Sequence, residues 1–167
     1  TLALAYASLL HQMRLDTERV IECADGVIAL CDRYGFAYYG DWARLLRGWT
    51  HGRSRPAEGI DIIESALERL DRHRAQARRP YYLSLLADMY ARDGRKDRAS
   101  TILDAARTMA LERGDVWWLP ALYLQQSELQ PAADRPAALK AALELARAHG
   151  SAGLERRILA ASNLSPA

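Results

Sequence analysis

Cysteine is scarce in this 167-residue chain, and its placement leaves no pair that could form an internal disulfide. Cys23 and Cys31 lie eight residues apart in one predicted helix, so their Cα atoms are about 12 Å apart at a rise of ~1.5 Å per residue. A disulfide requires less than about 7 Å. We therefore expect two small buried core residues in a reducing cytoplasm.

Long apolar runs are also missing. No stretch approaches the ~18–20 consecutive apolar residues that span a bilayer, and residues 1–14 lack a basic leader and a cleavage site. We expect a cytoplasmic chain with no membrane partner. Because the chain begins without Met, we also expect it to be a domain excised from a longer protein.

An excess of one charge is lacking as well. The formal net charge is +2, with 23 basic and 21 acidic residues interspersed, which is typical of a solvated surface. The densest basic run, Arg69 to Arg79, follows acidic residues on the same predicted helix and has no aromatic platforms. We interpret it as a helix end whose cations favour the negative end of the helix dipole, and we expect no nucleic-acid partner.

Motifs that carry chemistry are absent: there is no glycine-rich phosphate loop, HExxH, GxSxG or CxxC. Each of the four histidines lacks another His or Cys three or four residues away, so local metal-ligand spacing is missing. These histidines are His11, His51, His73 and His149. We expect no enzyme, no catalytic residues, no bound metal and no cofactor.

The apolar residues that are present are mostly Leu and Ala, with helix-forming Arg and Glu between them, whereas Val, Ile and Thr are sparse. This composition predicts an all-α fold. Expected helices cover about 2–13, 18–34, 37–50, from 56, from 80, 116–129, 137–149 and 154–161.

One complete helix–turn–helix repeat is visible from Arg79 to Gly114. The pattern W-x2-L-G-x2-Y…A-x3-F of the tetratricopeptide repeat fits it, with Leu83 in place of the Trp, Ala87 of the Gly and Leu103 of the Phe. Gly94 permits a tight turn, and a glycine at 114 is a common helix end.

The pattern recurs with a fixed period. Two sets of residues repeat every forty positions: Ile63, Leu103 and Leu143, and Ala66, Ala106 and Ala146. We predict a right-handed tetratricopeptide-like α-solenoid forming a single domain over 1–167. Its repeats would cover about 1–35, 36–78, 79–114 and 115–150, with a capping helix at about 153–162.

Several segments resemble a particular family. They are Ala7–Gln12, Leu46-Arg47-Gly48-Trp49, Pro56–Ile60 and Arg79–Ala87. Together they are similar to the C-terminal tetratricopeptide region of bacterial multidomain signalling proteins, in which a cyclase or DNA-binding output domain precedes an AAA/STAND-type ATPase. The chain departs from the family pattern at Gln130-Pro131 and in the short turn around Arg53. The resemblance implies a regulatory or scaffolding segment whose partner is the attached ATPase or output domain.

In a tetratricopeptide superhelix the first helix of each pair lines a concave groove, which suits an extended or helical peptide. Trp42, Leu45 and Trp49 share one helical face, and the next such helices continue the row. The predicted partner-binding residues are Trp42, Leu45, Trp49, Arg53, Tyr81, Ser84, Asp88, Arg92, Leu124 and Glu128. The alternative is that one or both tryptophans are buried between helices.

The sequence therefore leaves two functional hypotheses. The first is a non-enzymatic scaffold for protein–protein or interdomain contact in a bacterial signalling or transcriptional regulator. The second is a small-molecule sensor that encloses an inducer, for which a closed pocket around Trp42, Trp49 and Tyr81 would be expected. A homodimer through exposed solenoid ends is a further expectation, with Leu2, Tyr6, Leu9 and Leu10 at one end.

Overall fold

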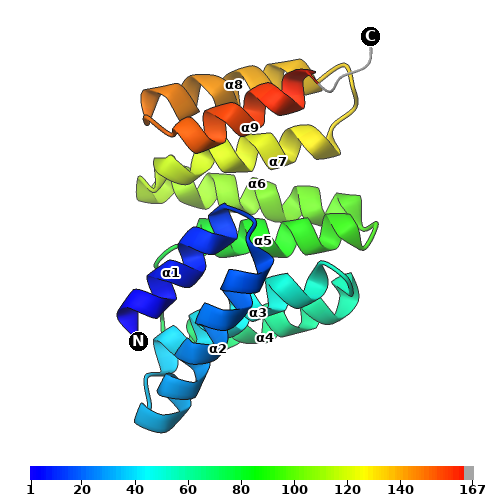
Figure 1. The fold of residues 1–167 in the computed structure, drawn as a ribbon. Coiled ribbons are helices and arrows are strands. Elements are labelled where there is room, and N and C mark those ends of the chain that lie inside the picture. The colour runs from blue at the N-terminus through cyan, green and yellow to red at the C-terminus, as the bar shows by residue number, and fades with distance from the viewer. Residues whose placement is uncertain (164–167) are drawn as a thin grey trace. The chain divides into compact units, whose positions relative to one another are not determined.

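The structure, a computed structural model, describes residues 1–163, and within that range the chain is helical with no strand (Figure 1). The elements are α1 (Leu2–Met13), α2 (Thr17–Tyr34), α3 (Ala37–Gly52), α4 (Pro56–Arg72), α5 (Arg79–Arg92), α6 (Lys96–Arg113), the 3₁₀ helix η1 (Val116–Trp118), α7 (Leu119–Leu129), α8 (Arg135–Ala148) and α9 (Ala152–Asn163). The predicted all-α class is confirmed. Residues 164–167, which the predicted domain includes, lie outside the described residues.

Most helices begin and end close to the expected positions, but one segment differs. The sequence predicted a continuous helix over 116–129, whereas the structure has η1 followed by α7. Pro120 explains the difference, because it has no N–H to donate to the carbonyl of Val116. That carbonyl instead accepts the N–H of Leu119, which closes a tighter 3₁₀ turn.

Several helix C-termini are followed by a residue with left-handed backbone conformation. Gly35 and Gly114, both predicted helix ends, have φ of 76° and 72°. Leu15 and Arg74 end α1 and α4 in the same conformation, with φ of 60° and 54°, although neither is glycine. Glycine and non-glycine residues thus both form this type of helix end.

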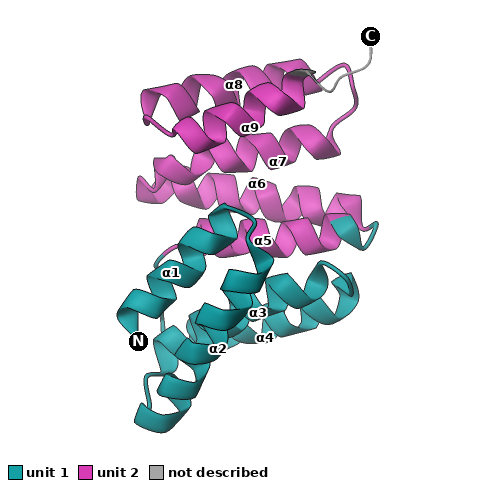
Figure 2. Cartoon of the chain, in the orientation of Figure 1, with its two compact units in different colours: residues 1–77, 92–94 teal, residues 78–91, 95–167 magenta. Residues whose placement is uncertain are grey.

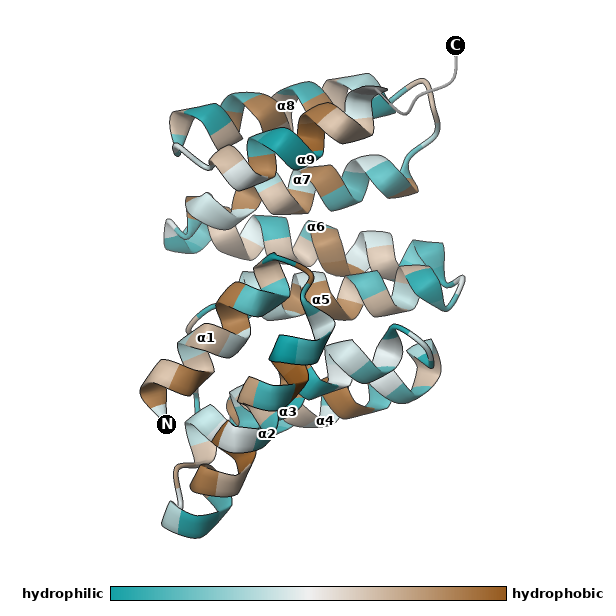
Figure 3. Cartoon of the chain, viewed as in Figure 1, coloured by the Kyte–Doolittle hydropathy of each residue, from teal (hydrophilic) through white to brown (hydrophobic). Residues whose placement is uncertain are grey.

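The chain divides into two compact units (Figure 2). Unit 1 consists of residues 1–77 with 92–94, and unit 2 consists of residues 78–91 with those from 95 onward. In both units hydrophobic and hydrophilic residues alternate along the helices (Figure 3), as expected where one helical face is buried.

In unit 1, α1 packs on α2, α2 on α3 and α3 on α4, and α1 also contacts α3. The closest approach is made by glycines on α3 and α4. A Cβ built on Gly59 would overlap the Cα of Gly52 and lie 2.9 Å from its N atom, and one built on Gly48 would lie 2.8 Å from Cγ2 of Ile62. The backbones of α3 and α4 therefore touch directly.

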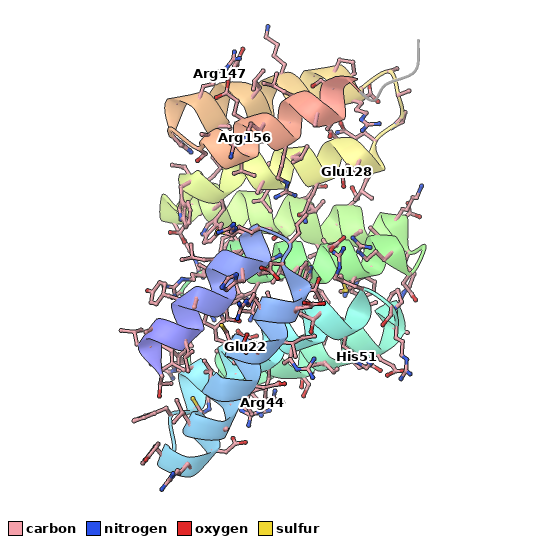
Figure 4. The ribbon with its side chains drawn as sticks, in the orientation of Figure 1. Glu22, Arg44, His51, Glu128, Arg147 and Arg156 are labelled. Atoms are coloured by element: carbon pink, nitrogen blue, oxygen red, sulfur yellow. The ribbon has the colours of Figure 1, made fainter. Side chains whose placement is uncertain are left out.

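Ion pairs fix α3 between its two neighbours; two of the α3 residues that take part, Arg44 and His51, are labelled in Figure 4. Two arginines of α3 pair with α2: Arg47 with Asp25 at 2.7 Å, and Arg44 with Asp32. On the other side, two residues of α3 pair with α4: Asp41 with Arg69 at 2.5 Å, and His51 with Glu58 at 2.6 Å. The hydrogen bond from His51 lowers the pKa of the exposed Glu58 carboxyl.

In unit 2, α7 packs on α6, α8 on α7, and α9 on both α8 and α7. One cluster of buried residues joins the last three helices: Leu124, Leu139, Ala142, Ala146 and Ile158. The alanines that recur every forty residues are fully buried in the unit to which each belongs, since Ala66, Ala106 and Ala146 have no exposed surface. Small residues at these positions let neighbouring helices approach closely.

Candidate functional site

The residues of the predicted groove divide between the two units and differ in exposure. Six are buried: Trp42, Leu45 and Trp49 in unit 1, and Tyr81, Ser84 and Leu124 in unit 2. Asp88 is half-buried, whereas Arg53, Arg92 and Glu128 are exposed. The alternative weighed from the sequence, that the tryptophans are buried between helices, therefore agrees with where the structure places them.

Trp42 illustrates why an aromatic row on one helical face need not line a groove. Its indole is 1% exposed and is surrounded by rings of unit 1. Tyr6 of α1 meets it edge-on with centroids 5.3 Å apart, and Tyr38 and Tyr39 of α3 lie at 6.3 and 6.1 Å. Such offset and edge-on contacts are typical of aromatic cores.

In unit 2, the predicted row forms part of the helix packing. The Ser84 hydroxyl donates to the Tyr81 carbonyl at 2.7 Å, and the Gln125 side chain of α7 donates to the Ser84 carbonyl at 3.3 Å. Burial raises the pKa of the Tyr81 phenol well above its ordinary value. These polar groups connect α5 with α7 inside the unit.

A stack of three aromatic rings carries an exposed tryptophan at the corner between α6 and α7. Tyr81 stacks on Trp118 with centroids 4.8 Å apart and planes 20° apart, and Trp117 lies on Trp118 at 3.9 Å. Trp118 is 5% exposed, whereas Trp117 is 49% exposed. Leu111 and Val116, close in sequence, are also exposed. We term this group the Trp117 corner. It exposes the large apolar side chain of Trp117, which packs on Trp118.

At the N-terminal helix the structure changes the set of exposed residues. Leu2, Tyr6 and Leu10 are exposed on α1, but Leu9 is buried at 5% and so does not belong to the exposed end as the sequence suggested. Homodimerisation through this helix stays a prediction.

Unit 1 contains a polar cleft of about 550 Å³ where α2, α3 and α4 meet. Its lining includes Asp41, Arg44 and Arg69, which belong to the ion pairs described above. Asp41 is 3% exposed and accepts from Arg69, so the buried carboxylate already has its counter-ion within the chain. The charged groups of this cleft satisfy one another, which indicates a structural role.

Unit 2 contains a second cleft, of about 360 Å³, between α6, α7 and the N-terminal half of α8. We term it the alanine cleft. Its lining residues are Arg107, Tyr123, Gln126, Gln130, Ala133, Asp134, Ala137, Ala138 and Ala141. One wall is therefore polar, and the other, apart from Asp134, consists of small apolar side chains.

Reactive and metal-binding groups are few. Cys23 and Cys31 are buried free thiols, as expected, and burial raises the pKa of each, which disfavours the reactive thiolate. In residues 1–163 no three His, Cys, Asp or Glu side chains gather closely enough to hold a metal ion. None of the described helices is both long and apolar enough to cross a bilayer.

Comparison of the chain with known protein families, with curated proteins and with solved structures finds no match. The functional interpretation therefore depends on the geometry of the chain itself. The alanine cleft had no signal in the sequence. For the Trp117 corner a signal existed, because adjacent residues on a helix point about 100° apart, which predicts that at most one of the two neighbouring tryptophans is fully buried, although not which one.

Proposed function

We propose that this chain is a non-enzymatic, tetratricopeptide-like α-solenoid that binds a protein, a peptide or an attached domain in a bacterial cytoplasmic regulator. Helix packing within each unit supports the solenoid. In unit 1 α1 contacts α3, and in unit 2 α7 contacts α9, so helices two positions apart also touch. Contact between the first helices of successive pairs is what stacked helical hairpins require.

The observation that carries the proposal is the Trp117 corner. Trp117 is half exposed, yet its ring is fixed on the buried Trp118. An exposed tryptophan that is already immobilised loses little side-chain entropy when a partner covers it, and tryptophan is enriched among the residues that dominate binding energy. Binding there would bias an attached output domain between states in proportion to its differential affinity for them.

The sensor hypothesis lacks comparable support. Trp42, Trp49 and Tyr81 line neither the cleft of unit 1 nor the alanine cleft.

The test is capture of partners by the immobilised chain from a lysate of its source organism. We expect the wild-type chain to retain a defined set of proteins and Trp117→Ser to reduce their retention about tenfold. Loss of the ring contact with Trp118 should lower the melting temperature by only about 2–4 °C, because half of Trp117 is exposed. Tyr34→Ser is the matched control, since Tyr34 is an exposed aromatic residue (57%) of unit 1. Retention that is equal for the wild type and Trp117→Ser, or no retention above that of the bare matrix, would contradict the proposal.

A further inference from the structure

The polar side chains of the alanine cleft bond to one another, and the charge of Arg107 is balanced within this wall. Arg107 of α6 pairs with Asp104 at 3.1 Å and donates to the Gln126 side-chain oxygen at 3.1 Å. The Gln126 amide nitrogen in turn donates to Asp104 at 3.0 Å. The Arg107 guanidinium also lies over the Tyr123 ring, 5.7 Å from its centroid. Because Asp104 neutralises Arg107 and Asp134 adds a negative charge at the rim, an anionic ligand is disfavoured.

Gln130, at the end of this wall, has an unsatisfied group. Its side-chain carbonyl oxygen is buried and has no hydrogen-bond partner among the described residues. The next residue is Pro131, which has no N–H to offer. A buried carbonyl without a donor costs about 1–3 kcal/mol, and exchanging the amide oxygen and nitrogen would leave a buried donor unsatisfied instead. A ligand that brings an N–H or O–H group would satisfy this oxygen.

The opposite wall allows a close approach. Ala133, Ala137 and Ala141 follow one another at intervals of four residues, and Ala138 lies beside them. Such a stripe has no long side chain that would hold a ligand backbone away from the helix. Asp134, at the start of α8, is the one charged residue of this wall.

We propose that the alanine cleft binds an extended, uncharged peptide segment of a partner protein. An extended backbone offers N–H and C=O groups alternately to its two sides. It therefore supplies the donor that Gln130 lacks and an acceptor for the Arg107 guanidinium and the Tyr123 hydroxyl. Small side chains of the peptide pack on the alanine stripe. This inference rests on the proposed function, for which it names a surface and the form of the partner, and the cleft is distinct from the Trp117 corner.

The experiment uses the full chain and a phage-displayed library of random peptides. Peptides enriched on the wild-type chain are synthesised with a fluorophore, and their Kd values are measured by anisotropy. Ala137→Trp fills the cleft from an exposed position of α8, and Ala148→Trp is the matched control, because Ala148 is exposed on the same helix and does not line the cleft. We expect Ala137→Trp to raise Kd more than about tenfold and Ala148→Trp to leave it unchanged.

Gln130→Met separates ligand binding from a structural role. If the carbonyl serves a ligand, its removal raises Kd about tenfold while the melting temperature stays the same or rises, because a buried unsatisfied group has been lost. A lower melting temperature with unchanged Kd would overturn the proposal. Enriched peptides whose Kd is insensitive to Ala137→Trp would overturn the proposal that the alanine cleft binds a peptide, but would not contradict the proposed function of the chain as an interaction scaffold. A failure to enrich peptides would also overturn peptide binding by the alanine cleft. The proposed scaffold function is tested separately, by the capture experiment with Trp117→Ser.

Discussion

Individual residues at helix ends store a small, removable strain in this chain. At the end of α4 the Arg74 N–H donates to the Asp71 carbonyl and the Ala75 N–H to the Leu70 carbonyl, both at 2.9 Å. This double hydrogen bond is the usual helix stop built around a left-handed residue. Arg74 occupies that left-handed position with φ of 54°, whereas α8 has Gly150 with φ of 64° at its end. A side chain in this conformation costs roughly 1–2 kcal/mol.

We therefore expect Arg74→Gly to stabilise unit 1. Relief of the left-handed strain exceeds the added chain entropy of glycine in the unfolded state, so the free energy of unfolding rises by up to about 1 kcal/mol. Urea denaturation with an unchanged m-value would measure it. Gly150→Ala, the converse change at α8, is expected to lower the free energy of unfolding by a similar amount. A destabilised Arg74→Gly variant would contradict this account.

At the residue scale, a helix end can be predicted from the sequence only where the residue type itself indicates the backbone conformation. Gly35 and Gly114 were predicted as helix ends because glycine tolerates a positive φ. Leu15 and Arg74 adopt the same conformation without any such signal, since hydrogen bonds of the finished turn impose it. Likewise, spacing placed Trp42 and Trp49 on one helical face, but the rings that cover Trp42 come partly from α1, a different helix.

The close contact between α3 and α4 is made by glycines that lie in two segments resembling the signalling family. Leu46–Trp49 and Pro56–Ile60, two of the segments that resemble the signalling family, contain Gly48 and Gly59. In the structure these glycines lie where α3 and α4 touch. The physical reason for glycine at 59 is therefore space rather than backbone freedom, because Gly59 lies within a regular helix.

Gly59→Ala tests this close contact. The added methyl group would overlap backbone atoms of Gly52, which cannot move aside as a flexible side chain would. We expect a loss of about 1–3 kcal/mol in the free energy of unfolding, measured by urea denaturation. Gly26→Ala in α2 is the control, since its Cβ would meet only the end of the Leu4 side chain, at 3.4 Å, and alanine is the better helix former. Equal stability of the two variants would argue against the contact.

At the scale of elements, helix positions were predictable but the clefts were not. Glycines and prolines mark helix limits locally, and at the start of α2 the Asp16 carboxylate accepts the Arg19 N–H, at 3.3 Å. The alanine cleft combines α6, α7 and α8, residues 107–141. The shape of this cleft depends on how the three helices pack, and it cannot be predicted from the residue pattern within any one helix.

Over the whole chain, the tryptophans report separately on the two units. Trp42 and Trp49 belong to unit 1, and Trp117 and Trp118 belong to unit 2. In chains built from stacked hairpins, each element is stabilised mainly by its neighbours, so local damage need not unfold the rest.

We expect Gly59→Ala to shift the unfolding of unit 1 to lower urea than that of unit 2. Fluorine NMR of the chain labelled with fluorotryptophan resolves each indole and follows its own transition. The signals of Trp42 and Trp49 should lose their native positions first, whereas those of Trp117 and Trp118 should keep them. Coincident transitions of all tryptophan signals in this variant would mean that the chain unfolds as one cooperative body.

The buried pair of Asp41 and Arg69 has a mechanical consequence. Were α4 to slide along α3 by one turn, Asp41, which is 3% exposed, would lose the Arg69 guanidinium 2.5 Å away. It would keep only the longer contact to Arg44 of its own helix, at 3.8 Å, and breaking a buried ion pair costs up to about 3–5 kcal/mol. Helix pairs without such a lock can ratchet between registers. In the α3–α4 hairpin the ion pair opposes that sliding motion, so a force applied to either helix displaces both helices together.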